Sequence, residues 1–238
     1  MIQEGAGMSS VLILVDLQGD YLREEDLQPP ADTLVAAAAA LVEGFRARQV
    51  PVVHVWTTID RACDRRLYHW RKTGRWLCVG GTAGHEPPAE LAPRAGEAVV
   101  HKTGYNAFED GSLAALLEGW ACDHVVLAGV HVHACVRTAA MECLGRGLRV
   151  TIAMDAAGSD DPLHAAATRR WLAERHVGFP GVEEILSSLD GGNRNGLVHR
   201  SPRNAAETLF EVAVARAAEI GHSGARAVQA QGPWCRSP

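Results

Sequence analysis

The stretch VVLAGVHVHACVRTAA, residues 125–140, places a thiol at the junction of two kinds of secondary structure. Its first six residues, 125–130, form a short apolar run typical of a buried strand. A helical pattern begins at Cys135. Because the dipole and unpaired N–H groups at the start of a helix favour an anion, we expect a stabilised thiolate there, close to donors for an oxyanion. The alternative is a small, buried, hydrophobic cysteine.

Two other apolar runs also end in reactive side chains. Residues 11–15 lead directly into Asp16, and residues 98–101 lead into Lys102. Since the carboxyl ends of the strands in an open parallel sheet border the ligand crevice, a carboxylate, an ammonium group and a thiol could meet in one cleft. Taken singly, Asp16 could cap a turn and Lys102 could be a solvated edge residue. Three reactive residue types at three strand ends favour a shared site.

The chain alternates strand-like and helix-like segments through most of its length. Strands are expected at about 10–16, 51–58, 97–101, 124–130 and 149–154, with a last short strand near 177–179. Helices are expected at about 31–48, 111–119 and 161–175, and after Cys135. This alternation predicts a three-layer α/β/α, Rossmann-like fold with a mostly parallel sheet of about six strands.

Three motifs carry a family resemblance. They are DLQGD at 16–20, KTGYNAF at 102–108 and GVHVHACVRTA at 129–139. Together they resemble the isochorismatase-like cysteine hydrolases, a family that includes nicotinamidase, N-carbamoylsarcosine amidase and isochorismatase itself. The resemblance covers a domain at about residues 9–190. It implies an Asp–Lys–Cys triad of Asp16, Lys102 and Cys135, a cis peptide bond between Val130 and His131, and an oxyanion hole formed by the backbone N–H groups of His131 and Cys135.

Such a triad suits the hydrolysis of an amide. Asp16 would take the proton of Cys135 and later pass it to the leaving amine, while Lys102 would hold Asp16 in place. We therefore expect cleavage of a C–N bond in a small amide, ureide or carbamoyl compound through a thioester, without a cofactor. Two alternatives stay open: an isochorismatase-type vinyl-ether hydrolase that uses Asp16 and Lys102, and a catalytically silent domain that partners a dehydrogenase.

Candidate substrate-binding residues lie near the same strand ends. Aromatic walls would suit a small planar substrate, although each aromatic side chain is equally explained by packing. An arginine of the basic segment 65–76 could pair with a substrate carboxylate. The candidates for substrate contact are Gln18, Tyr21, Trp56, Trp76, Tyr105 and Phe108.

Few residues of this sequence have the spacing of metal ligands. Nicotinamidases of the resembled family use an Asp-x-His pair after the second strand, but here Asp60 is followed by Arg61 and Ala62. His131 and His133 form an HxH pair that could ligate zinc, yet their spacing from other residues reveals no third or fourth ligand. We therefore expect no bound metal.

Composition narrows the function classes. The formal net charge of −5 over 238 residues argues against a nucleic-acid footprint. No apolar run approaches the roughly 20 residues needed to cross a bilayer, and the first residues lack the pattern of a signal peptide. Six cysteines without CxxC pairs disfavour a structural zinc site and a disulfide framework. We expect thiols, a cytoplasmic location, no membrane partner and, from the family resemblance, a homo-oligomer.

The last part of the chain differs in character. Residues 191–200 are expected to form a linker rich in Gly and Asn. Residues 201–238, with a Ser-Pro turn, a strand-like run at 209–214 and an Ala-rich stretch ending near Trp234, resemble the beginning of an aldehyde dehydrogenase domain. Two interpretations follow: a piece of a hydrolase–dehydrogenase fusion, with a fused or associated aldehyde dehydrogenase, or an appendage used for association.

Overall fold

The computed structural model describes residues 9–192, which belong to one compact unit. The segment that resembles an aldehyde dehydrogenase, 201–238, lies outside the described residues, as does most of the expected linker. The part of the linker that is described, residues 191 and 192, forms the end of a helix.

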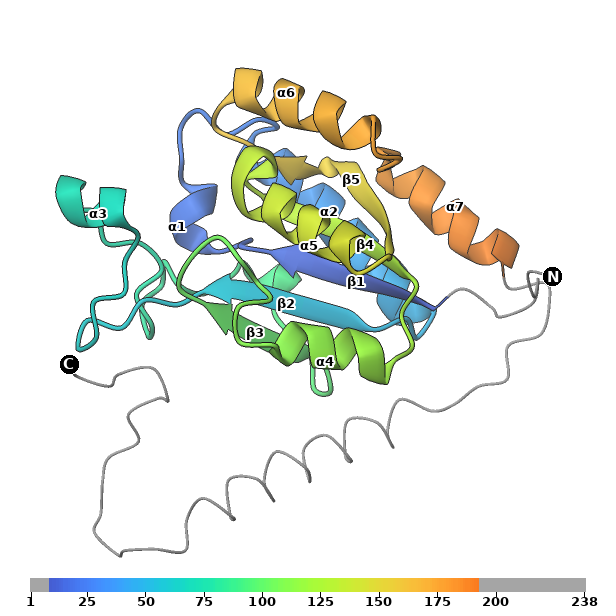
Figure 1. Cartoon of the computed structure of the whole chain (residues 1–238), viewed down its shortest axis with the longest axis horizontal. Helices are drawn as coiled ribbons and strands as arrows, with labels where there is room; N and C mark the ends of the chain where they lie inside the picture. The colour runs from blue at the N-terminus through green and yellow to red at the C-terminus, as the bar shows by residue number, and fades with distance from the viewer. Residues whose placement is uncertain (1–8, 193–238) are drawn as a thin grey trace, which may run out of the picture. The chain divides into compact units, whose positions relative to one another are not determined.

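A five-stranded sheet forms the centre of the described residues, and all its strands run parallel in the order β3-β2-β1-β4-β5 (Figure 1). Continuous runs of buried aliphatic residues are typical of parallel strands, which are covered on both faces. The parallel sheet is therefore built from the apolar runs seen in the sequence. The strands are β1 (Ser10–Val15), β2 (Val52–Thr57), β3 (Ala98–Lys102), β4 (His124–Val130) and β5 (Arg149–Gly158).

Helices cover both faces of the sheet. In Figure 1, α4 and α5 lie in front of the strands and α2 lies behind them. Side chains of α4, α5 and α6 pack on one face in a core with Ile13, while α2 and α7 pack on the other face with Leu12 and Leu14. The helices are α1 (Gly19–Leu22), α2 (Ala31–Ala47), α3 (Tyr68–Thr73), η1 (Ala89–Leu91), α4 (Ser112–Gly119), η2 (Val132–Val136), α5 (Arg137–Gly145), α6 (Pro162–Ala173) and α7 (Val182–Gly192).

The sheet differs from the sequence expectation at its last edge. The described residues form five strands rather than about six, because the segment near 177–179 makes a single bridge between Gly178 and Thr151. Pro180 follows and has no N–H group to continue a ladder. β5 is instead longer than expected and ends at Gly158.

The thiol-bearing segment also differs from the expectation. Cys135 lies within η2, one turn of π-helix in which the Val136 N–H donates to the His131 carbonyl at 3.2 Å, and the regular helix α5 begins only at Arg137. Such π turns occur often at functional sites. The sequence pattern predicted that a strand is followed by a helix here, but it did not predict the π-helical turn between them.

Parallel strands bring the three reactive side chains to one edge. Asp16 follows the end of β1, Lys102 is the last residue of β3, and η2 follows β4. Because β1 lies one strand from β4 and two strands from β3, these positions converge at the carboxyl edge of the sheet.

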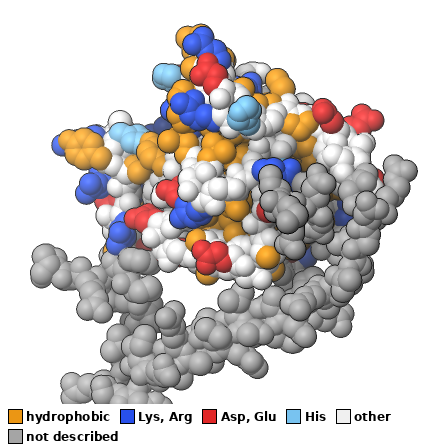
Figure 2. All heavy atoms as spheres, turned by 45° about the vertical axis from the view of Figure 1, so that its right-hand side comes forward, with side chains coloured by type: hydrophobic (Ala, Val, Ile, Leu, Met, Phe, Trp, Pro, Cys, Tyr) orange, Lys and Arg blue, Asp and Glu red, His pale blue; other side chains and the backbone are white. Residues whose placement is uncertain are grey.

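On the face seen in Figure 2, acidic and basic side chains are interspersed rather than gathered by sign.

Candidate active site

Asp16 is fixed by the end of the neighbouring strand β2. It is 1% exposed and has a positive φ of 55°, and its N–H donates to the Val55 carbonyl at 2.9 Å. Its Oδ1 accepts hydrogen bonds from the backbone N–H and the hydroxyl of Thr57, both at 2.9 Å. These contacts leave Oδ2 directed toward the other two reactive groups.

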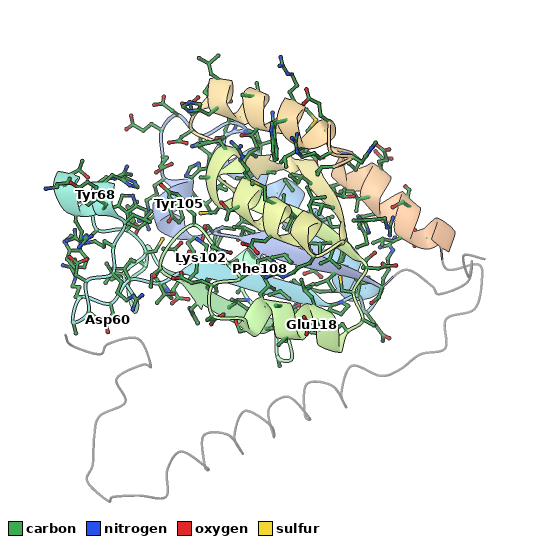
Figure 3. The ribbon with its side chains drawn as sticks, in the orientation of Figure 1. Asp60, Tyr68, Lys102, Tyr105, Phe108 and Glu118 are labelled. Atoms are coloured by element: carbon green, nitrogen blue, oxygen red, sulfur yellow. The ribbon has the colours of Figure 1, made fainter. Side chains whose placement is uncertain are left out.

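Lys102 completes a buried ion pair with that free oxygen. Its Nζ lies 2.8 Å from Asp16 Oδ2 and donates to Thr57 Oγ1 at 2.8 Å and to the Gly104 carbonyl at 3.0 Å. Burial alone would lower the pKa of Lys102, but the charges of Asp16 and Cys135 outweigh it and hold this pKa above its usual range. Lys102 is therefore positively charged in the site. It is the last residue of β3 (Figure 3).

Cys135 lies beside this pair. Lys102 Nζ donates a hydrogen bond to Cys135 Sγ at 3.3 Å, and Asp16 is near enough for its charge to act on the thiol. Burial raises the pKa of Cys135 to about 12, with the charge of Asp16 adding to the rise and that of Lys102 opposing it. The expected stabilised thiolate is therefore wrong for the resting site, because removal from water and a nearby carboxylate outweigh the ammonium group and the helix start.

A cavity of about 130 Å³ opens beside the thiol. Cys135 forms part of its wall, together with residues from the loops after β2, β3, β4 and β5. Its size suits a small molecule rather than a polymer. The lining residues are Tyr21, Glu24, Leu67, His69, Trp70, Arg75, Leu77, Gly104, Tyr105, His131, His133, Ala134, Cys135 and Asp160.

Two of the predicted substrate contacts lie on the cavity wall. Tyr21 donates its hydroxyl to Thr57 Oγ1 at 3.3 Å, and burial, followed by the charge of Asp16, raises the pKa of Tyr21 well above its usual range. Tyr105 is 43% exposed in the loop that follows Lys102 (Figure 3). Both phenols are protonated donors at neutral pH, and Tyr105 is the more exposed of the two.

The other predicted substrate contacts lie outside the cavity. Gln18 is fully buried and bridges two loops, donating to the carbonyls of Thr57 at 2.9 Å and of His85 at 2.8 Å. Trp56 packs edge-on against the rings of His85 and His101. A substrate role for Gln18 and Trp56 stays a prediction.

Trp76 and Phe108 are likewise engaged in packing. The guanidinium carbon of Arg66 lies 3.7 Å from the centroid of the Trp76 ring. Phe108 is 5% exposed within the core beneath α4, and the guanidinium carbon of Arg146 lies 4.4 Å from its ring centroid. Their substrate role also stays a prediction.

Thr57 is a central residue that the sequence interpretation missed. Its hydroxyl donates to Asp16 and accepts from Lys102 and Tyr21, so one oxygen links three of the side chains near the thiol. It is the last residue of β2 and is 1% exposed. Its place at a carboxyl strand end was the available signal, but a threonine there is also ordinary for a strand.

A second group of polar side chains on the cavity wall includes His131. The peptide bond between Val130 and His131 is cis. The His131 ring lies between two carboxylates, with Nε2 3.1 Å from Glu24 Oε2 and Nδ1 3.1 Å from Asp160 Oδ1. Glu24 and Asp160 were not selected from the sequence, because neither belongs to a recognisable ligand spacing.

Asp60 occupies the position where nicotinamidases have the aspartate of their Asp-x-His metal-binding pair. It is not part of the cavity wall. Its Oδ1 accepts a hydrogen bond from the Ala62 N–H at 2.8 Å in an exposed turn. Within residues 9–192, the group whose ligand atoms are close enough to hold one ion is Glu24, His131 and Asp160.

The cysteines are not uniform. Cys78, Cys122, Cys135 and Cys143 are free thiols. Cys63 is disulfide-bonded, so the expectation of thiols throughout is wrong at that position. A chain of this size has room for a full core without a disulfide framework, and the four thiols are all at least partly buried.

The parallel sheet and the buried Asp–Lys–Cys cluster at its carboxyl edge place the protein in the class of Rossmann-like hydrolases. The isochorismatase domain matches residues 10–175, and the chain belongs to the isochorismatase family.

Two characterised relatives differ in the chemistry that their names state. The chain is 34% identical over 152 residues to the secreted isochorismatase effector of Verticillium dahliae, a match that covers 64% of this chain and 74% of that protein. It is 38% identical over 77 residues to the maleamate amidohydrolase of Pseudomonas putida, covering 32% of this chain and 36% of that enzyme.

Solved structures share the fold. N-carbamoylsarcosine amidase from Thermoplasma acidophilum has a TM-score of 0.63 and 28% identity, covering 74% of this chain and 97% of that one. An isochorismatase family protein from Desulfovibrio vulgaris has a TM-score of 0.65 and 24% identity, covering 77% and 99%. Across residues 9–192, no helix is both long and apolar enough to span a membrane.

Proposed function

We propose that this isochorismatase-family hydrolase cleaves a C–N bond of a small amide, ureide or carbamoyl compound through Cys135. The observation that carries the proposal is the thiol itself, which accepts a hydrogen bond from Lys102, lies beside Asp16 and forms part of the cavity wall. A nucleophile adjacent to a base, with the base oriented by further groups, is the arrangement that covalent catalysis requires. The similarity to an amidohydrolase and an amidase supports the C–N bond as the target.

The first step forms the bond between Cys135 Sγ and the substrate carbonyl carbon. Because the pKa of Cys135 is raised to about 12, the resting group is a thiol, and its proton moves to Asp16 as the sulfur attacks. The carbonyl π electrons move to oxygen, where we assign the backbone N–H groups of His131 and Cys135 as donors. Lys102 offsets the charge of Asp16 in the resting site.

The second step breaks the C–N bond. Asp16 gives its proton to the departing nitrogen, so ammonia or an amine leaves and a thioester remains on Cys135. Water then attacks the thioester carbon and loses a proton to Asp16, the C–S bond breaks, and the thiolate takes that proton back. The sum is amide plus water giving acid plus amine.

Arg75 is the member of the basic segment 65–76 that lies on the cavity wall. Its guanidinium Nη2 lies 3.3 Å from Glu24 Oε1 and is half exposed. We propose it as the partner of a substrate carboxylate, because a guanidinium group binds carboxylates through paired hydrogen bonds. The relative named maleamate amidohydrolase supports a substrate that carries such a group.

A second candidate is vinyl-ether hydrolysis of the isochorismatase type. The 34% identity to the Verticillium dahliae isochorismatase effector favours it. In that reaction Asp16 and Lys102 would act without a covalent role for Cys135. The two candidates therefore differ in whether the thiol is required.

The test measures ammonia release from a panel of small amides, ureides and carbamoyl amino acids, and pyruvate release from isochorismate as a further substrate. Wild type is compared with Cys135→Ala and with Cys122→Ala, a control thiol that hydrogen-bonds to the His124 carbonyl and is not on the cavity wall. Turnover lost only in Cys135→Ala supports C–N hydrolysis. Isochorismate turnover that survives Cys135→Ala supports the ether hydrolase, and no turnover of any compound supports a silent domain.

A further inference from the structure

Three chain segments far apart in sequence bring metal-ligating side chains together beside the thiol. Glu24 follows α1, His131 follows β4, and Asp160 follows β5. One ligand atom from each lies within 4.8 Å of the others, and all three residues line the same cavity. Such convergence cannot arise from local sequence alone.

Two atoms of this cluster lack a hydrogen-bond partner within the described residues. Glu24 Oε2 and His131 Nδ1 are both buried from water. Each lies 3.1 Å from a neighbouring atom of the cluster, but neither pair has the angles of a hydrogen bond. A buried polar atom without a partner costs about 1–3 kcal/mol, and more when charged, so a bound group that contacts these two atoms would be stabilised here.

We propose that Glu24, His131 and Asp160 bind a divalent transition-metal ion on the cavity wall, at a site separate from the Asp–Lys–Cys cluster. An imidazole with two carboxylates is a donor set that suits zinc and similar ions. The two carboxylates would also favour a dication, beside the ion pair that Glu24 forms with Arg75.

His133 is placed to supply a fourth ligand. Its Nε2 lies 4.0 Å from Asp160 Oδ1, on the side of the cavity lined by the other three residues. Its other ring nitrogen, Nδ1, is 2.5 Å from Ser159 Oγ. A hydrogen bond at the second ring nitrogen is the usual way in which a metal-binding histidine is held in orientation.

The spacing of the side chains fits closure around an ion. Ligand atoms about 2 Å from a tetrahedral zinc ion lie about 3.4 Å from one another. The present span of at most 4.8 Å is somewhat wider than that value, and Asp160, whose side chain is 41% exposed, is the member least enclosed by its surroundings. In this proposal the further ligands beside the HxH pair are Glu24 and Asp160, which lie in distant segments of the chain and so could not be found from sequence spacing.

An ion here would face the space beside Cys135. It would bind a lone pair of a molecule in the cavity, such as a carboxylate oxygen, and so orient that molecule toward the thiol. The cluster of Glu24, His131 and Asp160 is a different place from Asp60, where the sequence was compared with the metal-binding pair of nicotinamidases. The proposal does not depend on hydrolysis, because its readout is metal binding.

The experiment uses the whole chain, stripped with EDTA and titrated with Zn²⁺ by calorimetry, and with Co²⁺ by visible absorption. The variants are Glu24→Gln and Asp160→Asn. Glu43→Gln is the matched control, since Glu43 also pairs with an arginine but is not part of the cavity wall. Cys135→Ser tests whether the thiol contributes a ligand.

We expect about one equivalent of Zn²⁺, with affinity lowered at least about tenfold in Glu24→Gln and in Asp160→Asn and unchanged in Glu43→Gln and Cys135→Ser. If Glu24→Gln fails to fold, Asp160→Asn alone decides, because its side chain is partly exposed. The proposal is overturned if wild type binds no Zn²⁺ or if the two site variants bind as tightly as wild type. It is also overturned if Cys135→Ser alone abolishes binding.

Discussion

At the scale of single residues, the hydroxyl of Thr57 organises the candidate active site. It donates to Asp16 Oδ1 at 2.9 Å and accepts from Lys102 Nζ at 2.8 Å, so both charged groups depend on one oxygen for their position. The Thr57 backbone N–H also donates to Asp16. Removing the hydroxyl should therefore disturb the ion pair without removing either charge.

We predict that Thr57→Val lowers kcat by about 10- to 100-fold, because a hydrogen bond to a charged group contributes about 1.5–3 kcal/mol. Thr57→Ser keeps the hydroxyl and should retain most of the activity. Steady-state kinetics with the substrate found in the panel checks this. Equal loss in both variants would show that the methyl packing, not the hydroxyl, is what the site requires.

The raised pKa of Cys135 gives a prediction for alkylation. The pKa of Cys135 is raised to about 12, so the thiolate fraction is small at pH 7 and grows about tenfold for each pH unit below that value. Iodoacetamide labelling of the resting protein should therefore increase steadily from pH 7 to about 10. Peptide mass spectrometry identifies the labelled cysteine, and free cysteine, with a pKa of about 8.5, is the reference that levels off. A labelling rate at Cys135 that is already level at pH 7 would contradict this.

The sequence was sufficient for the three reactive side chains and insufficient for their surroundings. Asp16, Lys102 and Cys135 could be found because each follows an apolar run, and strand ends of a parallel sheet meet. Thr57, Glu24 and Asp160 could not, because their roles depend on distances across loops. The pKa of Cys135 was misjudged for the same reason, since burial beside a carboxylate is not visible in the helix start.

At the scale of elements, the end of β4 sets the position of the thiol. Gly129 has a φ of +127°, and a Cβ atom there would lie 2.0 Å from the Val15 carbonyl oxygen of β1. The pairing register between β4 and β5 shifts between Leu127 and Gly129. Glycine thus allows β4 to approach β1 closely just before the chain turns into η2.

We predict that Gly129→Ala lowers the free energy of unfolding by at least about 3 kcal/mol, because it combines a strained φ with a clash against backbone. Gly145→Ala, in α5, has no atom within 4 Å of its added Cβ and should be neutral or stabilising by up to about 1 kcal/mol. Urea denaturation of the two variants and wild type measures both. Equal stability of the two variants would contradict the close approach.

The elements themselves were largely predictable. The expected strands at 10–16, 51–58, 97–101 and 124–130 are close to β1, β2, β3 and β4, because buried parallel strands are continuous apolar runs. The errors lie at the sheet edge. β5 extends to Gly158, and the segment at 177–179 is a single bridge, because edge pairing depends on neighbours that local sequence does not specify.

At the scale of the whole molecule, the described residues hold two hydrophobic core clusters. Both core clusters draw their buried residues from Val11 to Ile185, on the two faces of one sheet. A hydrophobic core of this extent is what a domain of its size needs in order to fold alone. The residues of the proposed activity and of the proposed metal site also belong to this range.

We predict that a chain of residues 9–192 unfolds cooperatively and keeps the turnover of the full chain within about twofold, a free-energy difference of roughly 0.4 kcal/mol. Circular dichroism during heating and steady-state kinetics measure the two properties. Loss of cooperative unfolding in the shortened chain would show that residues 193–238 belong to the same folding unit.

The proposed mechanism requires a covalent intermediate on Cys135. The most direct measurement is rapid acid quenching of the wild-type protein during turnover of its best amide substrate, followed by peptide mass spectrometry. We predict an acyl group on the peptide that contains Cys135, released as the acid over time, and neither adduct nor turnover in Cys135→Ala. Turnover that continues at the wild-type rate in Cys135→Ala would contradict the claim.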